Sequence, residues 1–132
     1  MRILILTTEQ WQTMRRHVDA EAPLEACGLL AGRDSLVESI HQIRNQAQSP
    51  ARYVMDPQEQ LNAFEWIESN HLDLLAIYHS HPTGPETVSA TDIEEAAYPV
   101  VYVVWSRMVG QWQAQAFWIE NGKVSEVLMQ IV

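Results

Sequence analysis

Residues 72–92 read LDLLAIYHSHPTGPETVSATD, and the interpretation of the whole chain starts from this stretch. It opens with an apolar run from Leu72 to Tyr78, broken only by Asp73, which is typical of a buried strand. Two histidines follow at positions i and i+2, and an extended backbone points such a pair to the same side. A Pro-Thr-Gly-Pro turn then precedes the start of a new helix at Ser89. The stretch therefore predicts a strand, two neighbouring imidazoles and a turn that brings the chain back toward them.

The polar side chains of this stretch suit a metal ion. His79 and His81 offer two nitrogen ligands, and the turn brings back a carboxylate as a third. Catalytic zinc is held by three such ligands with a fourth position open. Each residue also has a structural explanation, because His79 could be a hydrogen-bonded strand-end histidine and Asp92 could cap Ser89. Two imidazoles on one side of a strand, however, are costly to desolvate unless something uses their lone pairs.

Composition limits the class of protein. The chain has 132 residues, which we interpret as one domain, 1–132, able to form a core without disulfides. Eight basic against seventeen acidic residues give a net charge of −9. Such a charge repels phosphate backbones and argues against a nucleic-acid partner. Cys27 is the only cysteine, which excludes an internal disulfide and a Cys-x-x-Cys motif.

The sequence contains no sign of membrane insertion or export. No apolar run approaches the roughly 20 residues that span a bilayer. The first residues have only four apolar positions in a row, shorter than the apolar core of a signal peptide. We therefore expect no membrane association and a cytoplasmic location.

Periodicity and end signals predict the other elements. Thr7 and Gln10 form a capping-box pattern, and Asp56 stands as an N-cap before Pro57. Asn121-Gly122 is a strong hairpin turn, and Val100–Trp105 is apolar on both faces, as in the centre of a covered sheet. The expected strands are 3–6, 25–32, 36–43, 53–55, 72–78, 100–105, 112–119 and 123–132, and the expected helices are 8–22, 57–70 and a short one from Ser89 through Ala97. The fold class is α+β: a mostly antiparallel sheet flanked by two main helices and one short helix.

The motif at residues 79–92 resembles a known family signature. His79-Ser80-His81-Pro82, six residues, and then Ser89-Ala90-Thr91-Asp92 match the His-x-His-Pro-x6-Ser-x-x-Asp pattern of the JAMM (MPN-plus) zinc metallopeptidases. The segment Glu25–Gly32 looks like the family's glutamate-containing strand. Residues 45–57 and 98–106 are also similar to small stand-alone prokaryotic members. The resemblance covers essentially the whole chain and implies a JAMM/MPN fold, which is cytidine-deaminase-like.

The resemblance implies a role for each site residue. His79, His81 and Asp92 would bind one Zn²⁺ ion, with water as the fourth ligand. Glu25 would take a proton from that water and pass it to the leaving amine, and Ser89 would stabilise the oxyanion. Sequence alone does not choose Glu25 over Glu21 or Glu38, so this role rests on the resemblance.

The resemblance also implies a substrate class. Members of the family hydrolyse the amide bond after the C-terminal glycine of ubiquitin-like proteins. We expect a zinc peptidase or isopeptidase acting on a ubiquitin-like or sulfur-carrier protein, with a carrier–amino-acid adduct favoured over a modifier on a lysine side chain. Cys27 is expected to pack in the core, because free cysteine behaves as a small apolar group. The remaining histidines, His17, His41 and His71, are interpreted as surface or structural residues.

Three alternatives belong to other functional classes. A non-catalytic MPN interaction module would have lost the metal ligands, which this chain keeps. RadC-type domains linked to DNA repair share part of the pattern, but the acidic charge argues against such a role. A zinc deaminase needs a Pro-Cys-x-x-Cys motif, which a single cysteine excludes.

Overall fold

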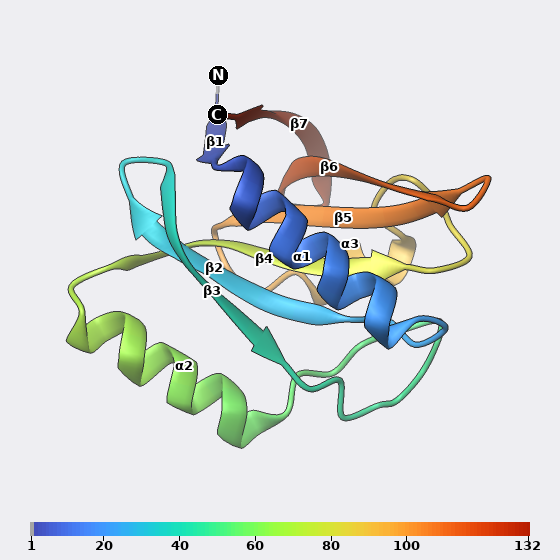
Figure 1. Cartoon of the computed structure of the whole chain (residues 1–132), viewed down its shortest axis with the longest axis horizontal. Helices are drawn as coiled ribbons and strands as arrows, with labels where there is room; N and C mark the ends of the chain where they lie inside the picture. The colour runs from blue at the N-terminus through green and yellow to red at the C-terminus, as the bar shows by residue number, and fades with distance from the viewer. Residues whose placement is uncertain (1) are drawn as a thin grey trace.

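A computed structural model describes residues 2–132 of the chain (Figure 1). In this part of the protein seven strands form one closed sheet in the order β1-β3-β2-β4-β5-β6-β7. The elements are β1 (Ile3–Leu6), α1 (Thr8–Glu21), β2 (Cys27–Arg33), β3 (Leu36–Ile43), α2 (Pro57–Ser69), β4 (Asp73–His81), α3 (Ala90–Glu95), β5 (Val101–Met108), β6 (Gln111–Glu120) and β7 (Lys123–Ile131). The predicted α+β class, with two main helices and one short helix, is confirmed.

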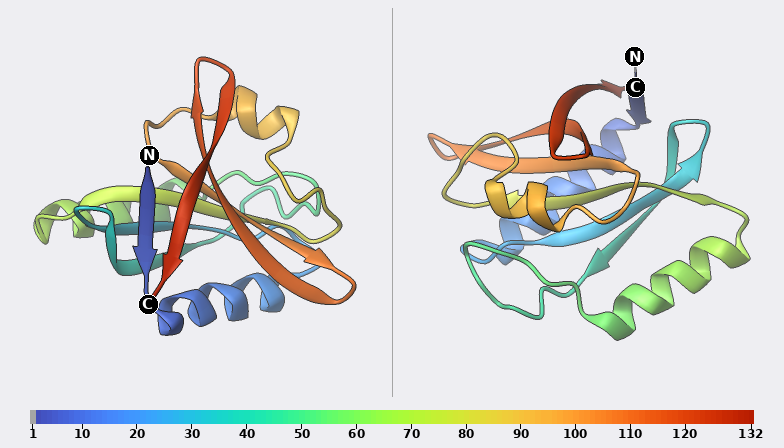
Figure 2. Two further views of the ribbon diagram at one scale, coloured as in Figure 1. Left: turned by 90° about the horizontal axis from the view of Figure 1, so that it is seen from above. Right: turned by 180° about the vertical axis from the view of Figure 1, so that it is seen from behind.

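Most neighbouring strands are antiparallel, as predicted. Strand β2 pairs antiparallel with β3 and β4, and β6 pairs antiparallel with β5 and β7. Three pairs are parallel: β4 with β5, and β1 with both β3 and β7. The β1–β7 pairing places the first and last strands of the chain side by side (Figures 1 and 2). The sheet is therefore mixed, with the histidine-bearing strand β4 in its interior.

The two faces of the sheet carry different cores, because side chains alternate along each strand. On one face, Leu30, Tyr78 and Trp105 pack with Met14 and Val18 of α1. On the other face, the cluster contains Leu29, Ile77 and Val104 from the strands, Ala63 and Ile67 from α2, and Val88 from the segment before α3. Figure 2 shows α3 on the side of the sheet opposite to α1. His79 lies on the face of Ile77, so the sheet directs it toward α2 and α3.

The end signals in the sequence correspond to real helix ends and turns. Thr7 and Gln10 form the predicted capping box of α1, and the Asp56 side chain accepts hydrogen bonds from the first turn of α2. Asn121 and Gly122 both have positive φ, of 52° and 74°, which a two-residue type I′ turn requires. Val101 to Ser106 of β5 are all buried between β4 and β6.

Some predicted boundaries were wrong. Residues 53–55 form no strand and contribute a single bridge, Asn45 to Met55, because their backbone pairs with residues 44–46 over too short a stretch for a ladder. Strand β2 begins at Cys27, so Glu25 lies just before the strand. Strand β4 continues through both histidines, because β2 pairs with His79 and β5 with His81. Helix α3 ends at Glu95, before Ala97.

Glycine is required at one close contact in the core. A Cβ atom added to Gly28 would clash with the ring of Tyr78. This approach lets the Tyr78 ring cover β2 and reach His17, whose Nδ1 lies 2.7 Å from the tyrosine hydroxyl. Within residues 2–132 no helix is long and apolar enough to cross a bilayer.

Candidate metal centre and active site

The end of β4 positions the two predicted histidine ligands. Because His79 and His81 are two residues apart in a regular strand, both side chains point to the face that carries α3. Ser80 points the other way, and its hydroxyl accepts a hydrogen bond of 2.8 Å from the Ala26 N–H. That bond joins the strand to the segment that carries Glu25.

Three ligand-type atoms converge at this point. The Nε2 atoms of His79 and His81 are 3.0 Å apart. The Oδ2 atom of Asp92 lies 3.1 Å from each of them. Ligand atoms about 2.0–2.1 Å from a tetrahedral zinc ion are roughly 3.3 Å from one another. The triangle therefore has nearly the dimensions of one face of a tetrahedral zinc site.

A second contact fixes the orientation of His81. Its Nδ1 donates a hydrogen bond of 2.8 Å to the backbone carbonyl of Pro85. A carbonyl only accepts, so Nδ1 carries a proton. In the neutral ring Nε2 then has a free lone pair for a metal, whereas in the protonated ring Nε2–H donates to Asp92. Metal-binding histidines usually donate their other N–H in this way. His79 is instead held by stacking on Tyr53: the two ring centroids are 4.8 Å apart and the ring planes are inclined by 30°.

Asp92 reaches the histidines through the first turn of α3. Its Oδ2 accepts a hydrogen bond of 2.8 Å from the Ser89 N–H, and its own N–H donates to the Ser89 hydroxyl at 3.1 Å. This pair is a capping box, so the structural explanation of Ser89 and Asp92 holds. The same geometry places the Asp92 carboxylate against both imidazoles. The hydrogen bonds that cap α3 therefore also place the predicted ligand Asp92.

Burial and hydrogen bonding set the protonation states of these three residues. Burial lowers the pKa of His79, which favours the neutral imidazole that a metal needs. Burial alone would raise the pKa of Asp92, but hydrogen bonds from His79 and His81 outweigh it and hold the pKa well below its usual range. Burial opposes protonation of His81 too, yet its hydrogen bonds to Asp92 and Pro85 raise its pKa.

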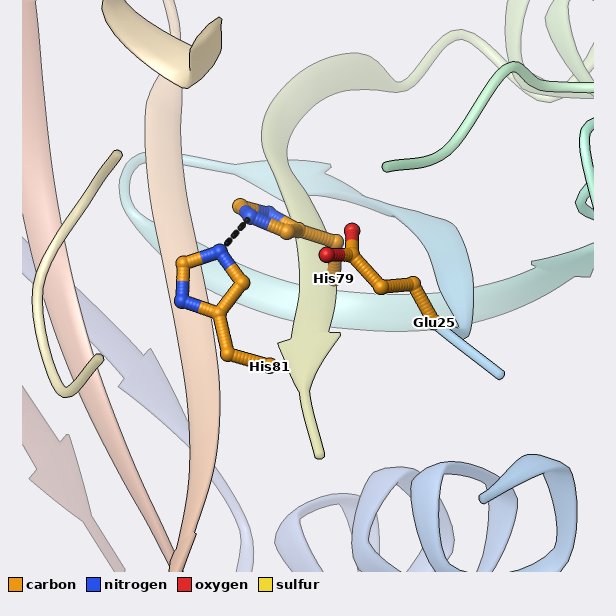
Figure 3. Close-up of side chains that lie close together, drawn as sticks. All are labelled: Glu25, His79 and His81. Carbon is orange, nitrogen blue, oxygen red and sulfur yellow. Dashed lines mark hydrogen bonds between the residues drawn. The ribbon is translucent and has the colours of Figure 1, made fainter. Parts of the chain in front are cut away.

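Glu25 stands beside this triangle without belonging to it. Figure 3 shows its carboxylate directed toward His79 and His81, and its ligand atom lies within 4.8 Å of theirs. The residue is only 4% exposed, and Oε1 has no hydrogen-bond partner among the described residues. Burial raises the pKa of Glu25 to about 7, with His81 opposing the shift and Asp92 adding to it. A carboxyl with that pKa exchanges protons readily near neutral pH.

The side chains present fit a zinc ion. Two imidazole nitrogens and one carboxylate oxygen are a donor set that zinc accepts in catalytic sites. The outer contact of His81 with Pro85 is of the type that supports a zinc ligand. The unpartnered oxygen of the buried Glu25 also indicates that this site receives a further group.

The other predicted residues occupy structural positions. Cys27 is fully buried, and its Sγ donates to the carbonyl of Ile43 at 3.3 Å, which confirms core packing. His17 is buried against Tyr78, and His41 contacts Ser39. Sequence reasoning missed the contribution of Tyr53, which no motif marks, although an aromatic residue in a polar loop was a weak signal.

Comparison with known proteins identifies the family. Residues 7–120 match the family described as prokaryotic homologs of the JAB domain. A probable TtuB-protein conjugate cleaving protease from Thermus thermophilus is 42% identical over 110 residues, covering 83% of this chain and 71% of that protein. The CysO-cysteine peptidase of Mycobacterium tuberculosis is 28% identical over 134 residues, covering 98% of this chain and 92% of that one.

A solved structure agrees with this match. The solution structure of a protein from Desulfitobacterium hafniense is 34% identical and superimposes with a TM-score of 0.87, covering 98% of this chain and 92% of that chain. The sequence resemblance, the mixed sheet and the histidine-bearing strand lead to the same conclusion: the chain belongs to the prokaryotic JAB-domain (JAMM/MPN-plus) metallopeptidase family.

Proposed function

We propose that this protein is a zinc-dependent peptidase that hydrolyses the amide bond after the C-terminal glycine of a ubiquitin-like or sulfur-carrier protein. The observation that carries the proposal is the triangle of His79 Nε2, His81 Nε2 and Asp92 Oδ2, with sides of 3.0 and 3.1 Å. The names of the two relatives, a conjugate cleaving protease and a CysO-cysteine peptidase, support the substrate class.

In this proposal the three atoms of the triangle hold one zinc ion. Asp92 is the third ligand in preference to Glu25, because its oxygen lies 3.1 Å from both nitrogens while the Glu25 group extends to 4.8 Å. When bound, zinc supplies Lewis-acid chemistry, polarising a carbonyl and making water more acidic.

Glu25 carries the proton. Its carboxylate takes a proton from the attacking water as the oxygen adds to the carbonyl carbon, and it gives that proton to the leaving nitrogen as the C–N bond breaks. The products are the free carboxylate of the carrier's glycine and an amine. A residue with a pKa of about 7 can serve in both directions at neutral pH.

Ser89 stabilises the negative charge that develops on the carbonyl oxygen. Its hydroxyl oxygen already accepts from the Asp92 N–H, so the hydroxyl proton remains to be donated. A preorganised donor of this kind is worth about 10²–10³-fold in rate. The capping role and the catalytic role are compatible, because they use different atoms of one hydroxyl group.

Substitutions can distinguish the role of the metal ligands from the role of the residue that carries the proton. His81→Ala should lose zinc, since it removes one corner of the triangle. Glu25→Gln should keep about one zinc per chain and lose hydrolysis by about 10²–10⁴-fold, the range for a general acid–base. Zinc content by mass spectrometry and product formation measure the two effects. Wild-type protein that binds no zinc would disprove the proposal.

The leaving amine is the second question for experiment. A carrier with a C-terminal cysteine adduct and the same carrier joined to a lysine side chain present the same glycine carbonyl. Incubating each with the enzyme and weighing the released carrier tells which bond is broken. Cleavage of neither, by zinc-loaded protein, would remove this substrate class.

A further inference from the structure

One buried amide side chain outside the predicted site connects two segments that form it. Asn45 follows β3 directly and is 9% exposed. Its side chain makes four hydrogen bonds to the backbone. Both acceptor sites are used, because Oδ1 accepts from the N–H groups of Ala47 and Val54 at 3.0 Å each.

The donor side of the same amide reaches the catalytic segment. Nδ2 donates to the carbonyl of Glu25 at 3.0 Å and to the carbonyl of Arg52 at 3.1 Å. An asparagine side chain has two N–H donors and two lone pairs, so its hydrogen-bonding capacity is fully used here. Such complete pairing of a buried amide favours one conformation of the residues around it.

Contacts of the Glu25 backbone, including this one, decide where its carboxylate lies. The residue precedes β2, so no strand ladder pairs its carbonyl. Its N–H donates to the carbonyl of Ser49 at 2.9 Å, within the loop that Asn45 organises. Its carboxylate oxygen Oε1 has no partner among the described residues. The position of the carboxylate therefore depends on where the loop and Ser80 hold the backbone of residues 25–26.

We propose that Asn45 is a positioning residue for Glu25: it fixes the backbone from which the proton-carrying carboxylate reaches the centre. Asn45 touches neither the metal ligands nor the reacting atoms. Its loss should therefore lower the rate of the chemical step and leave zinc and substrate binding in place. The inference rests on the proposed role of Glu25 in hydrolysis.

The test compares three zinc-loaded variants with the wild type. Asn45→Asp keeps the acceptor for Ala47 and Val54 but replaces the donor to Glu25 and Arg52 by an oxygen. Asn45→Ala removes all four bonds without adding charge, and is the second variant should the first fail to fold. Gln46→Ala, an exposed neighbour in the same loop, is the matched control.

We expect kcat to fall by about 10–100-fold in either Asn45 variant, because small displacements of a catalytic group have effects of this size. KM should change by less than about twofold and zinc should remain near one per chain. Hydrogen exchange at residues 25–27 should be faster in the variants than in the control. Gln46→Ala should match the wild type in all four measurements.

Two results would overturn the inference. One is a kcat within about twofold of the wild type in a folded, zinc-loaded Asn45 variant. The other is a loss of activity in proportion to zinc lost or to the fraction unfolded, since this is what a purely structural residue produces. Failure of the proposed function is distinct, because it shows in the wild type and in Glu25→Gln before any Asn45 variant is made.

Discussion

The buried polar residues of this protein are of two kinds. Some are paired in a hydrogen bond, and others have an atom without a hydrogen-bond partner. Tyr78 and His17 form a closed pair in the core, with 2.7 Å between the hydroxyl and Nδ1. Glu25 is equally buried, yet one of its oxygens has no partner. A buried polar group without a partner is unfavourable. The hydrogen bond at His17 therefore avoids this cost, whereas the unpaired oxygen of Glu25, where the chemistry is proposed, lowers the stability of the fold.

The pH dependence of folding should reveal the His17 pair. Burial lowers the pKa of His17, and Glu21 opposes the shift only in part. The unfolded chain then takes up a proton before the folded one as pH falls, so this residue's contribution is present above the unfolded pKa and is lost below it. The difference in free energy of unfolding between the wild type and His17→Gln should become smaller from about pH 8 to about pH 5.

Tyr78→Phe is the control for that measurement, because it removes the hydrogen bond but leaves the imidazole buried. It should keep the wild-type dependence on pH, since burial is the main cause of the shift. Urea unfolding at several pH values gives both curves. A His17→Gln difference that is the same at every pH would contradict the interpretation.

Helix α3 is held in place by the interactions at its ends more than by hydrogen bonds along its own short length. It has six residues, and none of them is buried. So short a helix is not stable alone in water. The capping box of Ser89 and Asp92 supplies its first turn, and Ile93 packs partly against the core. Its first turn places the Asp92 carboxylate at the proposed centre, so we expect the stability of α3 to be coupled to metal binding.

Substitutions of Ser89 separate capping from catalysis. Glycine is nearly as good an N-cap as serine, whereas alanine is worse by about 1 kcal/mol. If the hydroxyl donates to the oxyanion, Ser89→Ala and Ser89→Gly should both lower kcat by about 10²–10³-fold at saturating zinc. Ser89→Thr keeps the hydroxyl and should retain activity. Wild-type kcat in Ser89→Gly would show that Ser89 acts only as a cap.

At the scale of the whole molecule, the proposed centre lies between a strand paired on both sides and a segment that has few buried residues. His79 and His81 belong to β4, which β2 and β5 flank on both sides. Asp92 belongs to the connection between β4 and β5, on the opposite side of the sheet from α1 (Figure 2). An ion held by all three residues would join the two parts.

Removal of zinc should therefore loosen one region and leave the barrel intact. After treatment with a strong chelator, hydrogen exchange should rise in residues 82–98 and stay low in β4 and β5, because pairing with neighbouring strands holds β4 and β5 without the ion. The midpoint of thermal unfolding should fall, as a ligand at about 100 times its Kd stabilises by roughly 2.7 kcal/mol. Restoring zinc should reverse both changes. Equal changes along the whole chain would contradict this picture.

The local pattern of the chain was enough to predict much of its local structure and the pair of histidines in the proposed centre. Caps at Thr7, Asp56 and Ser89 and the Asn121-Gly122 turn depend on neighbouring residues, so they were readable from sequence. The spacing of His79 and His81 also follows from strand geometry alone. Segment 53–55 was misjudged because its backbone pairs with residues 44–46 over too short a stretch to form a strand.

What only the tertiary structure decided is which distant groups meet. Glu25 reaches the centre because β2 pairs with β4, with Cys27 opposite His79. No local pattern distinguishes it from the other glutamates, and the family resemblance alone had selected it. The role of Asn45 was likewise invisible, since its partners at Glu25 and Val54 are brought together by folding. Local backbone preferences are written in the sequence near each residue, whereas contacts between segments depend on the packing of the whole sheet.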